Sequence, residues 1–374
     1  MSKLFSPLTL RDLTLRNRTM VAPMCQYSSV DGFATDWHFV HLGRFGMGGF
    51  GLVMLEASGV LPEARITYGD LGIYKDEHIA PLARIVDFLH SQGAAVGIQL
   101  AHAGRKASTS VSWNGPEQLA TEEQRRKLGY EHWQPVGPSA ISHDPNDPDF
   151  QVPLALDRAG IDRVIAGFAA AARRADQAGF DTVEVHAAHG YLLNQFLSPL
   201  ANARTDNYGG SLENRMRLTL EVAEAVRAAW PSGKPLMARL SVSDNAEGGW
   251  TVEDSVVLAR ELKAIGVDAI DCSSGGLAQG RIKPAPAYQV PFSAAVRNGA
   301  GIATAAVGLL DDVLAAEAIL ERGEADIIAL ARGAMKDPNW AVNANLALGG
   351  NYDLWPIQTQ RVDSRDRFFG KAQI

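Results

Sequence analysis

The stretch FDTVEVHAAHGYLLNQFLSP, residues 180 to 199, joins an apolar run to three polar rings. Its first part, FDTVEV, has the composition of a buried β-strand. His186, His189 and Tyr191 then follow within six residues. A lone histidine near a strand end is more often a satisfied polar side chain than a catalyst. Three hydrogen-bonding rings at one strand exit instead predict a functional site.

Runs of the same kind recur along the chain and alternate with segments of helical period. They are continuous hydrophobic runs rather than alternating ones, which is typical of parallel strands buried on both faces. Helices with N-cap residues Asp157, Ser211 and Thr251 are expected between later runs. The predicted strands cover residues 19–24, 50–57, 94–101, 181–187, 235–241, 268–274, 301–307 and 326–332.

Eight strands alternating with helices predict an α/β fold, a (β/α)8 TIM barrel. A doubly wound open sheet would show the same alternation. No Gly-x-Gly-x-x-Gly follows the first strand, and polar residues follow many different strands rather than gathering at one switch point, so the barrel is favoured. We expect one domain over residues 1–374, with the turn-rich segment 104–155 as an insert or lid after strand three.

Composition narrows the class of protein. A net charge of −7 without a long basic run argues against a nucleic-acid partner. No apolar stretch has membrane length, and the N-terminus lacks a signal-peptide core, so a cytoplasmic protein is expected. Two cysteines are too few for a disulfide scaffold or an iron–sulfur cluster.

The late strand exits contain glycine-rich turns that suit a phosphate group. Gly308, Ala331 and Arg332 lie where barrels of this kind commonly bind phosphate. Arg332 could alternatively pair with a helix carboxylate. The strand exits show no carboxylate pair and no Schiff-base lysine, and His186 and His189 lack an acidic third ligand nearby. We therefore expect no metal and a phosphate-bearing cofactor that performs the chemistry.

Four motifs carry a resemblance to a known family. PMCQY (23–27), QLAHAGRKA (99–107), the long motif that begins at His186 and ends at Arg215, and DCSSG (271–275) resemble the Old Yellow Enzyme family of FMN-dependent ene-reductases, in particular its thermophilic-like branch. The resemblance implies FMN, with NADPH or alternatively NADH as reductant. It also implies activated alkenes such as enones, maleimides and nitroalkenes as substrates.

The family's functional residues map onto matching positions of this chain. Gln99 would contact the pyrimidine edge of the flavin, and Arg239 would place positive charge beside it. His186 and His189 would hold the substrate's activating oxygen, Tyr191 would donate the proton, and Tyr27 would line the substrate pocket. The implied cofactor-binding set is Pro23, Met24, Cys25, Ala57, Gln99, Arg239, Gly308, Ala331 and Arg332. Ala331 stands where the family usually has glycine, and its N–H can still reach a phosphate if its φ is negative.

The C-terminal segment 350–374 extends beyond the eighth predicted strand and helix. Pro356, Gln358 and Arg361 match a tail motif whose arginine, in the branch that this chain resembles, enters the partner's active site. A homodimer, or a tetramer built from dimers, is therefore expected, with Arg361 as a substrate-binding residue. Two other functions stay open at this point: a flavin-binding sensor or storage module without turnover, and a metal-dependent barrel hydrolase.

Overall fold

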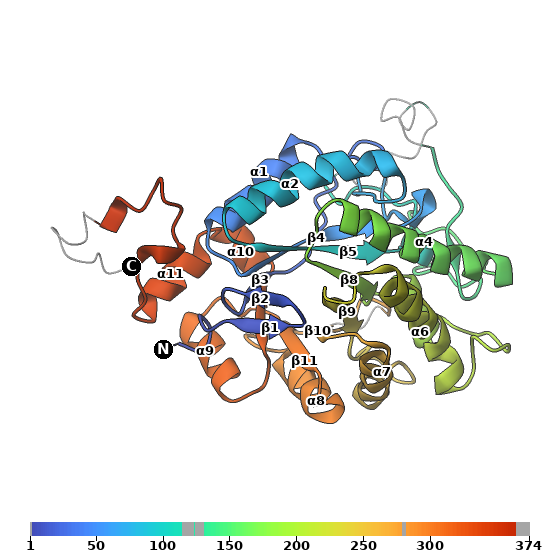
Figure 1. Cartoon of the computed structure of the whole chain (residues 1–374). Helices are drawn as coiled ribbons and strands as arrows, with labels where there is room; N and C mark the ends of the chain where they lie inside the picture. Colours follow the sequence, from blue (N-terminus) through green and yellow to red (C-terminus); the bar gives the residue numbers. More distant parts are fainter. Residues whose placement is uncertain (1, 114–122, 124–130, 279–281, 364–374) are drawn as a thin grey trace.

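The computed structural model describes residues 2–113, 123, 131–278 and 282–363, and its centre is a closed barrel of eight parallel strands (Figure 1). Consecutive strands are neighbours around the barrel, and the eighth closes on the first. All eight predicted strands are confirmed, and so is the TIM barrel. The strands are β3 (Thr19–Val21), β4 (Leu52–Gly59), β5 (Ala95–Ala101), β8 (Thr182–Ala187), β9 (Leu236–Ser241), β10 (Ala269–Ser273), β11 (Ala303–Val307) and β12 (Ile327–Leu330).

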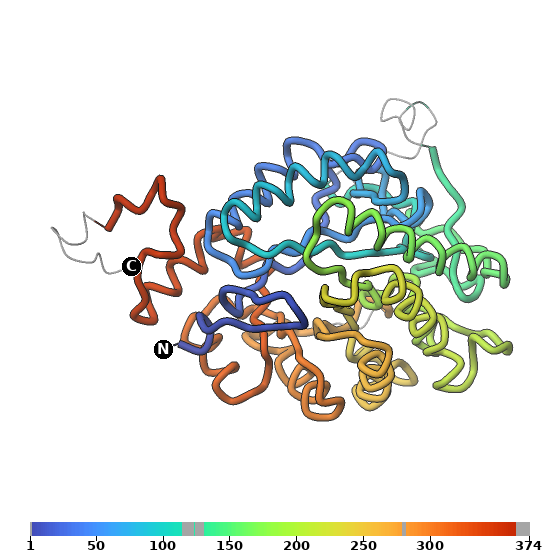
Figure 2. The backbone as a smooth tube through the Cα atoms, viewed as in Figure 1, coloured from blue at the N-terminus to red at the C-terminus, as the bar shows by residue number. Residues whose placement is uncertain are grey.

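The strands are continuous apolar runs because both of their faces are covered. One face packs against the surrounding helices, where Val183 and Val185 of β8 join the large outer core. The other face fills the barrel, where Met20, Met54 and Met237 join a separate inner cluster. Alternation along each strand thus sorts side chains between the two cores. Figure 2 shows the chain winding around this centre.

Three helices begin at the N-cap residues that were predicted for them. The side chains of Asp157, Ser211 and Thr251 each accept a backbone N–H at the start of a helix, and Thr251 forms a capping box with Asp254. The helices are α1 (Asp36–Met47), α2 (Ile79–Ser91), α4 (Arg158–Gln177), α5 (Leu192–Leu197), α6 (Leu212–Ala229), α7 (Val252–Ile265), α8 (Val290–Ala300), α9 (Val313–Glu321), α10 (Arg332–Lys336) and α11 (Trp340–Ala347).

Short elements complete the ends of the barrel. The hairpin of β1 (Leu8–Leu10) and β2 (Leu13–Leu15) packs against the inner cluster. The described part of the 104–155 segment contains η3 (Gly104–Lys106) and the two-stranded pair of β6 (Val136–Gly137) and β7 (Leu154–Ala155). The remaining 3-10 turns are η1 (Pro62–Ala64), η2 (Asp76–His78) and η5 (Tyr352–Leu354).

Candidate active site

The three rings of the 186–191 motif gather at the mouth of the barrel. His186 lies near the carboxyl end of β8, and His189 and Tyr191 occupy the turn that leads into α5. The His186 ring centroid is 5.2 Å from that of His189 and 5.1 Å from that of Tyr191. Since all barrel strands are parallel, their carboxyl ends all lie at this end of the barrel. The structure therefore brings together the three predicted catalytic residues.

The turn at His189 is held by contacts from several strands. His189 adopts a φ of 59°, which is uncommon for a residue other than glycine. Its N–H donates to Ser241 Oγ at 2.9 Å, and its ring Nε2 lies 2.7 Å from Ser273 Oγ. The Lys106 ammonium donates to the carbonyl oxygens of His189 at 3.0 Å and Gly276 at 3.1 Å. These contacts fix the direction of the imidazole.

Lys106 lies at the candidate site, although the sequence alone gave it no role there. Its Nζ lies 5.1 Å from the centre of the Tyr191 ring, and burial lowers its pKa to about 8. Neighbouring Arg105 does anchor the insert, because its guanidinium donates to the carbonyls of Ile141 and Ser142. The pattern HAGRKA shows two adjacent cations, and only the fold separates their roles.

Burial controls the charge of the three rings. It lowers the pKa values of His186 and His189 well below the ordinary 6.5, and it raises the pKa of Tyr191 well above 10. The imidazoles are therefore neutral and the phenol is protonated at pH 7. Nδ1 of His186 is buried and has no hydrogen-bond partner among the described residues. The site thus offers uncharged hydrogen-bonding groups rather than a charged pair.

The exits of β3 and β4 form the adjoining wall. Cys25 packs in one small cluster with Tyr191 and Trp133, and burial raises its pKa. Burial also raises the pKa of Tyr27, whose ring meets that of Trp113 edge-on at 5.7 Å. Pro23 and Met24 are half-buried just before Cys25, and Ala57 is buried within β4.

A buried carboxyl group holds this wall in place. Glu56 Oε1 accepts the backbone N–H of Gln26 at 3.1 Å, between Cys25 and Tyr27. The sequence alone did not assign Glu56 to the site. Its supporting role depends on the path of the 22–27 loop, which only the structure gives.

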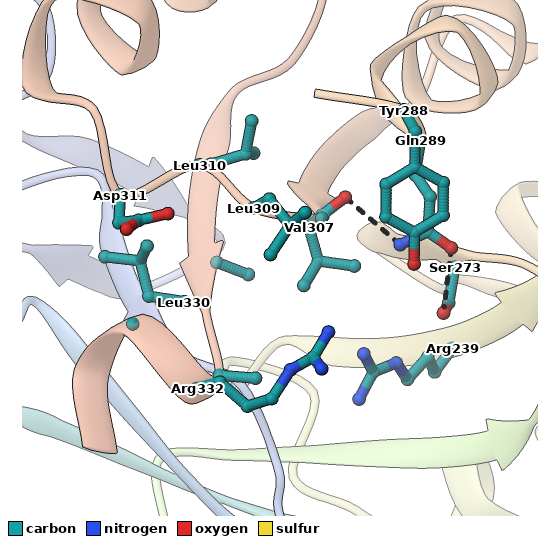
Figure 3. A pocket seen from close by; sticks show the side chains of 14 residues that line it. Arg239, Ser273, Tyr288, Gln289, Val307, Leu309, Leu310, Asp311, Leu330 and Arg332 are labelled. Carbon is teal, nitrogen blue, oxygen red and sulfur yellow. Dashed lines mark hydrogen bonds between the residues drawn. The ribbon is translucent and has the colours of Figure 1, made fainter. Parts of the chain in front are cut away.

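The late strand exits line a cavity of about 160 Å³ (Figure 3). Gly308, Ala331 and Arg332 border it, and the side chain of Arg239 lies on the same side as that of Arg332. Gly308 has a φ of +124°, and a Cβ there would lie 3.0 Å from the Tyr288 ring, so glycine is required. Ala331 has a φ of −103°, the negative value that its predicted N–H contact with a phosphate requires.

The chemistry of this cavity fits an anionic cofactor. Arg332 makes no ion pair with a carboxylate in the described part of the chain, so the alternative of a helix-acid partner is not supported. Arg239 pairs with Asp271, with 3.1 Å between Nε and Oδ2. Two guanidinium groups beside glycine-rich turns suit a phosphate-bearing group such as FMN. Ser273, Tyr288 and Gln289, which the sequence reasoning did not assign, also line the cavity.

The last predicted cofactor contact, Gln99, lies inside the barrel. It is buried, and its Nε2 donates to Oε1 of Glu184 at 2.7 Å. The Glu184 carboxyl group therefore fixes the orientation of the Gln99 amide. Arg361 instead lies on the exposed tail after α11, which projects away from the barrel in Figure 1. The tail residues 364–374, with Phe368 and Phe369, fall outside the described part.

The described residues contain no cluster of three or more His, Cys, Asp or Glu side chains arranged to hold a metal ion. Their helices include none with both the length and the apolar character needed to cross a membrane.

Comparison with known proteins identifies the family. Residues 3–349 match the NADH:flavin oxidoreductase / NADH oxidase family. NADPH dehydrogenase of Geobacillus thermodenitrificans is 42% identical over 360 residues, covering 96% of this chain and 98% of that relative. NADPH dehydrogenase of Listeria welshimeri is 44% identical over 351 residues, covering 93% and 96%.

A solved structure of similar shape agrees with this family. Morphinone reductase superposes with a TM-score of 0.76 at 29% identity, covering 92% of this chain and 90% of its own. The chain therefore belongs to the NADH:flavin oxidoreductase / NADH oxidase family, as an FMN-dependent oxidoreductase of the Old Yellow Enzyme type that takes its electrons from NADPH.

Proposed function

We propose that the enzyme reduces activated alkenes, such as enones, maleimides and nitroalkenes, by adding hydride to the β carbon and a proton to the α carbon. The supporting observation is the group of two neutral imidazoles and one protonated phenol at the barrel mouth. Reduced FMN supplies the hydride when bound. The residues proposed to hold it are Pro23, Met24, Cys25, Ala57, Gln99, Arg239, Gly308, Ala331 and Arg332.

His186 and His189 would bind the carbonyl or nitro oxygen of the substrate. An alkene accepts hydride only if the negative charge that develops on this oxygen is stabilised, and the loss of one such donor typically costs about 2.7–4 kcal/mol. The buried Nδ1 of His186 has no hydrogen-bond partner among the described residues, which supports a role for this ring in holding a ligand. Neutral rings can donate one N–H each, and the Ser273 contact to His189 Nε2 fixes the direction of the second ring.

Tyr191 would then deliver the proton to the α carbon. Its phenol keeps its proton because burial raises its pKa, and its ring lies beside that of His186. Lys106 faces the Tyr191 ring and would favour phenolate as the proton leaves. Tyr27 would line the pocket on the β3 side. A sensor or storage module would not require this proton donor.

An anaerobic experiment tests the proposal. The holoenzyme is reduced with one equivalent of NADPH and mixed with 2-cyclohexenone in a stopped-flow instrument. We expect the yellow oxidised flavin spectrum to return and cyclohexanone to form in equal amount. Saturated cyclohexanone is the matched control and should leave the flavin reduced. Failure of cyclohexenone, maleimides and nitroalkenes alike to reoxidise the flavin would contradict the proposal.

A further inference from the structure

The barrel interior contains a layer of four polar side chains beneath the mouth. They come from four consecutive barrel strands, and their exposed fractions are 2%, 0%, 6% and 0% for Gln99, Glu184, Arg239 and Asp271. Gln99 pairs in register with Glu184, and Arg239 with Asp271. The interior cluster around them is apolar, with residues such as Met54, Met237 and Ala305.

The charges in this layer do not balance. Two carboxyl groups share one guanidinium, so full ionisation would leave a net negative charge in an apolar interior. A buried charge without compensation costs several kcal/mol, and protonation removes that cost. Asp271 has the Arg239 guanidinium as an ion-pair partner, with 3.1 Å between Nε and Oδ2, although neither of its oxygens has a hydrogen-bond partner among the described residues. Glu184 has only the neutral amide of Gln99 at Oε1 and no hydrogen-bond partner at Oε2. The proton therefore belongs on Glu184.

The surroundings of Glu184 agree with this assignment. Burial, and then the charge of Asp271, raise its pKa to about 8, although Arg239 lowers it. Burial raises the pKa of Asp271 as well. Among the described residues, the ionisable groups facing Glu184 are Arg239 from β9, Asp271 from β10 and His186 on its own strand, while β5 contributes neutral Gln99.

Arg239 belongs to this layer and to the cofactor cavity at once. Its side chain borders the cavity in Figure 3, and it pairs in register with His186. The coupling between this layer and the cofactor rests on the proposed function, which places the hydride-delivering ring beside His186. The Arg239 guanidinium would stabilise the negative charge that this ring gains on reduction. The same guanidinium would then neutralise less of the negative charge of Glu184 and Asp271.

We propose that Glu184 and Asp271 form a proton-binding site that is coupled through Arg239 to the charge of the bound FMN, so that in alkaline solution, where Glu184 has lost its proton in the oxidised enzyme, it takes a proton up again when the cofactor is reduced. The proton comes from solvent and forms an O–H bond on the Glu184 carboxylate. The two electrons come from NADPH as hydride, and no bond of the protein breaks. By linkage, protonation of Glu184 favours the reduced cofactor to the same degree.

The sign of the coupling gives its pH window. Burial raises the pKa of Glu184 to about 8, so below that pH we expect this carboxyl to carry its proton before reduction and to take up nothing further. Above that pH the oxidised enzyme has lost this proton, and reduction restores it. The wild type should therefore take up as much as one extra proton per two electrons on the alkaline side, and its midpoint potential should fall more steeply with pH there.

The test uses the FMN-bound enzyme without any alkene. The midpoint potential is measured by anaerobic dye equilibration from about pH 7 to about pH 10, and the proton number is taken from its slope. Glu184→Gln should lose the extra proton on the alkaline side. Asp244→Asn is the matched control, because Asp244 is a buried carboxyl with a raised pKa that bonds Ser198 and not Arg239. Equal slopes in wild type and Glu184→Gln would overturn the proposal.

A second variant covers the case in which Glu184→Gln does not retain FMN. Asp271→Asn leaves Glu184 as the remaining carboxyl beside Arg239, so the extra uptake should move to lower pH. If the pH range of the extra proton uptake is the same in Asp271→Asn as in the wild type, the proposed coupling is wrong. Since cyclohexenone is absent throughout, failure of alkene reduction and failure of proton coupling give separate results.

Discussion

At the residue scale, the proposed chemistry depends on the protonation states that burial imposes on ordinary side chains. Tyr191 and the two histidines have no unusual chemistry in solution. In the barrel mouth the phenol stays protonated and the imidazoles stay neutral, since water cannot solvate their charged forms. Each of the following two substitutions therefore separates one role from cofactor binding.

Tyr191→Phe should slow alkene reduction and leave reduction of FMN by NADPH close to wild type. General-acid assistance is typically worth about 10²–10⁴-fold, and the loss should approach that range. Stopped-flow absorbance resolves the two half-reactions. Equal slowing of both would show that Tyr191 is not the proton donor.

His186→Ala should weaken the binding of phenolic ligands, whose oxygen mimics the charge that develops on the substrate. Loss of a hydrogen bond to a charged group is worth about 1.5–3 kcal/mol, so Kd should rise by about 10- to 100-fold. Titration with p-hydroxybenzaldehyde, followed by the flavin spectrum, measures it. Unchanged affinity would refute the oxygen-binding role.

At the element scale, the start of an outer helix is set by capping residues close to it in the sequence, whereas the barrel interior is formed by residues from distant strands. α7 begins with the Thr251–Asp254 capping box at an exposed position. Thr251→Ala should lower the free energy of unfolding by about 1 kcal/mol, while Thr251→Ser keeps the cap. Urea midpoints of the two variants measure the difference, and identical midpoints would contradict it. Activity should not change, because α7 is not among the elements that line the site.

At the scale of the whole molecule, seven buried or half-buried histidines make stability depend on pH. Burial lowers the pKa of each below 6.5, so the unfolded chain binds their protons first as pH falls. Their stabilising contribution is complete above about pH 6.5 and is lost below it. Glu184 and Asp70, with raised pKa values, act in the opposite direction and offset part of this loss. The residues are His38, His41, His78, His102, His143, His186 and His189.

The expected result is a lower urea midpoint at about pH 5 than at about pH 7. Glu184→Gln removes one of the offsetting carboxyls and should widen the difference. An equal or higher midpoint at the lower pH would show that the raised carboxyl pKa values outweigh those of the histidines.

The C-terminal tail that follows α11 is the basis of a prediction about how two chains assemble. We propose a homodimer, which can pack further into a tetramer, in which Arg361 reaches the partner's substrate pocket. A tail that projects from the barrel and exposes Ile357 supports this proposal. Mixed dimers test it: chains carrying Tyr191→Phe and His186→Ala are combined with Arg361→Ala chains. The intact pocket then receives a normal Arg361, and substrate affinity should exceed that of the Arg361→Ala homodimer. No recovery would refute the exchange.

The sequence by itself determined the barrel and the positions of its strands, and it predicted a site at their carboxyl ends. Eight uninterrupted apolar runs are visible in the sequence because both faces of a parallel strand are buried. Since all strand exits meet at one end of the barrel, residues as distant as Tyr27 and Arg332 could be assigned to one site. The helix caps were also local signals, and Asp157, Ser211 and Thr251 were confirmed.

Only the tertiary structure decided how the neighbours of these residues act. Lys106 and Arg105 are adjacent cations in the sequence, yet one holds the His189 turn and the other holds the insert. Glu184 is one more residue of an apolar strand until the closed barrel places it beside Gln99 and near the Arg239–Asp271 pair. Charge state depends on burial and on partners from other strands, and neither quantity is encoded in local residue spacing.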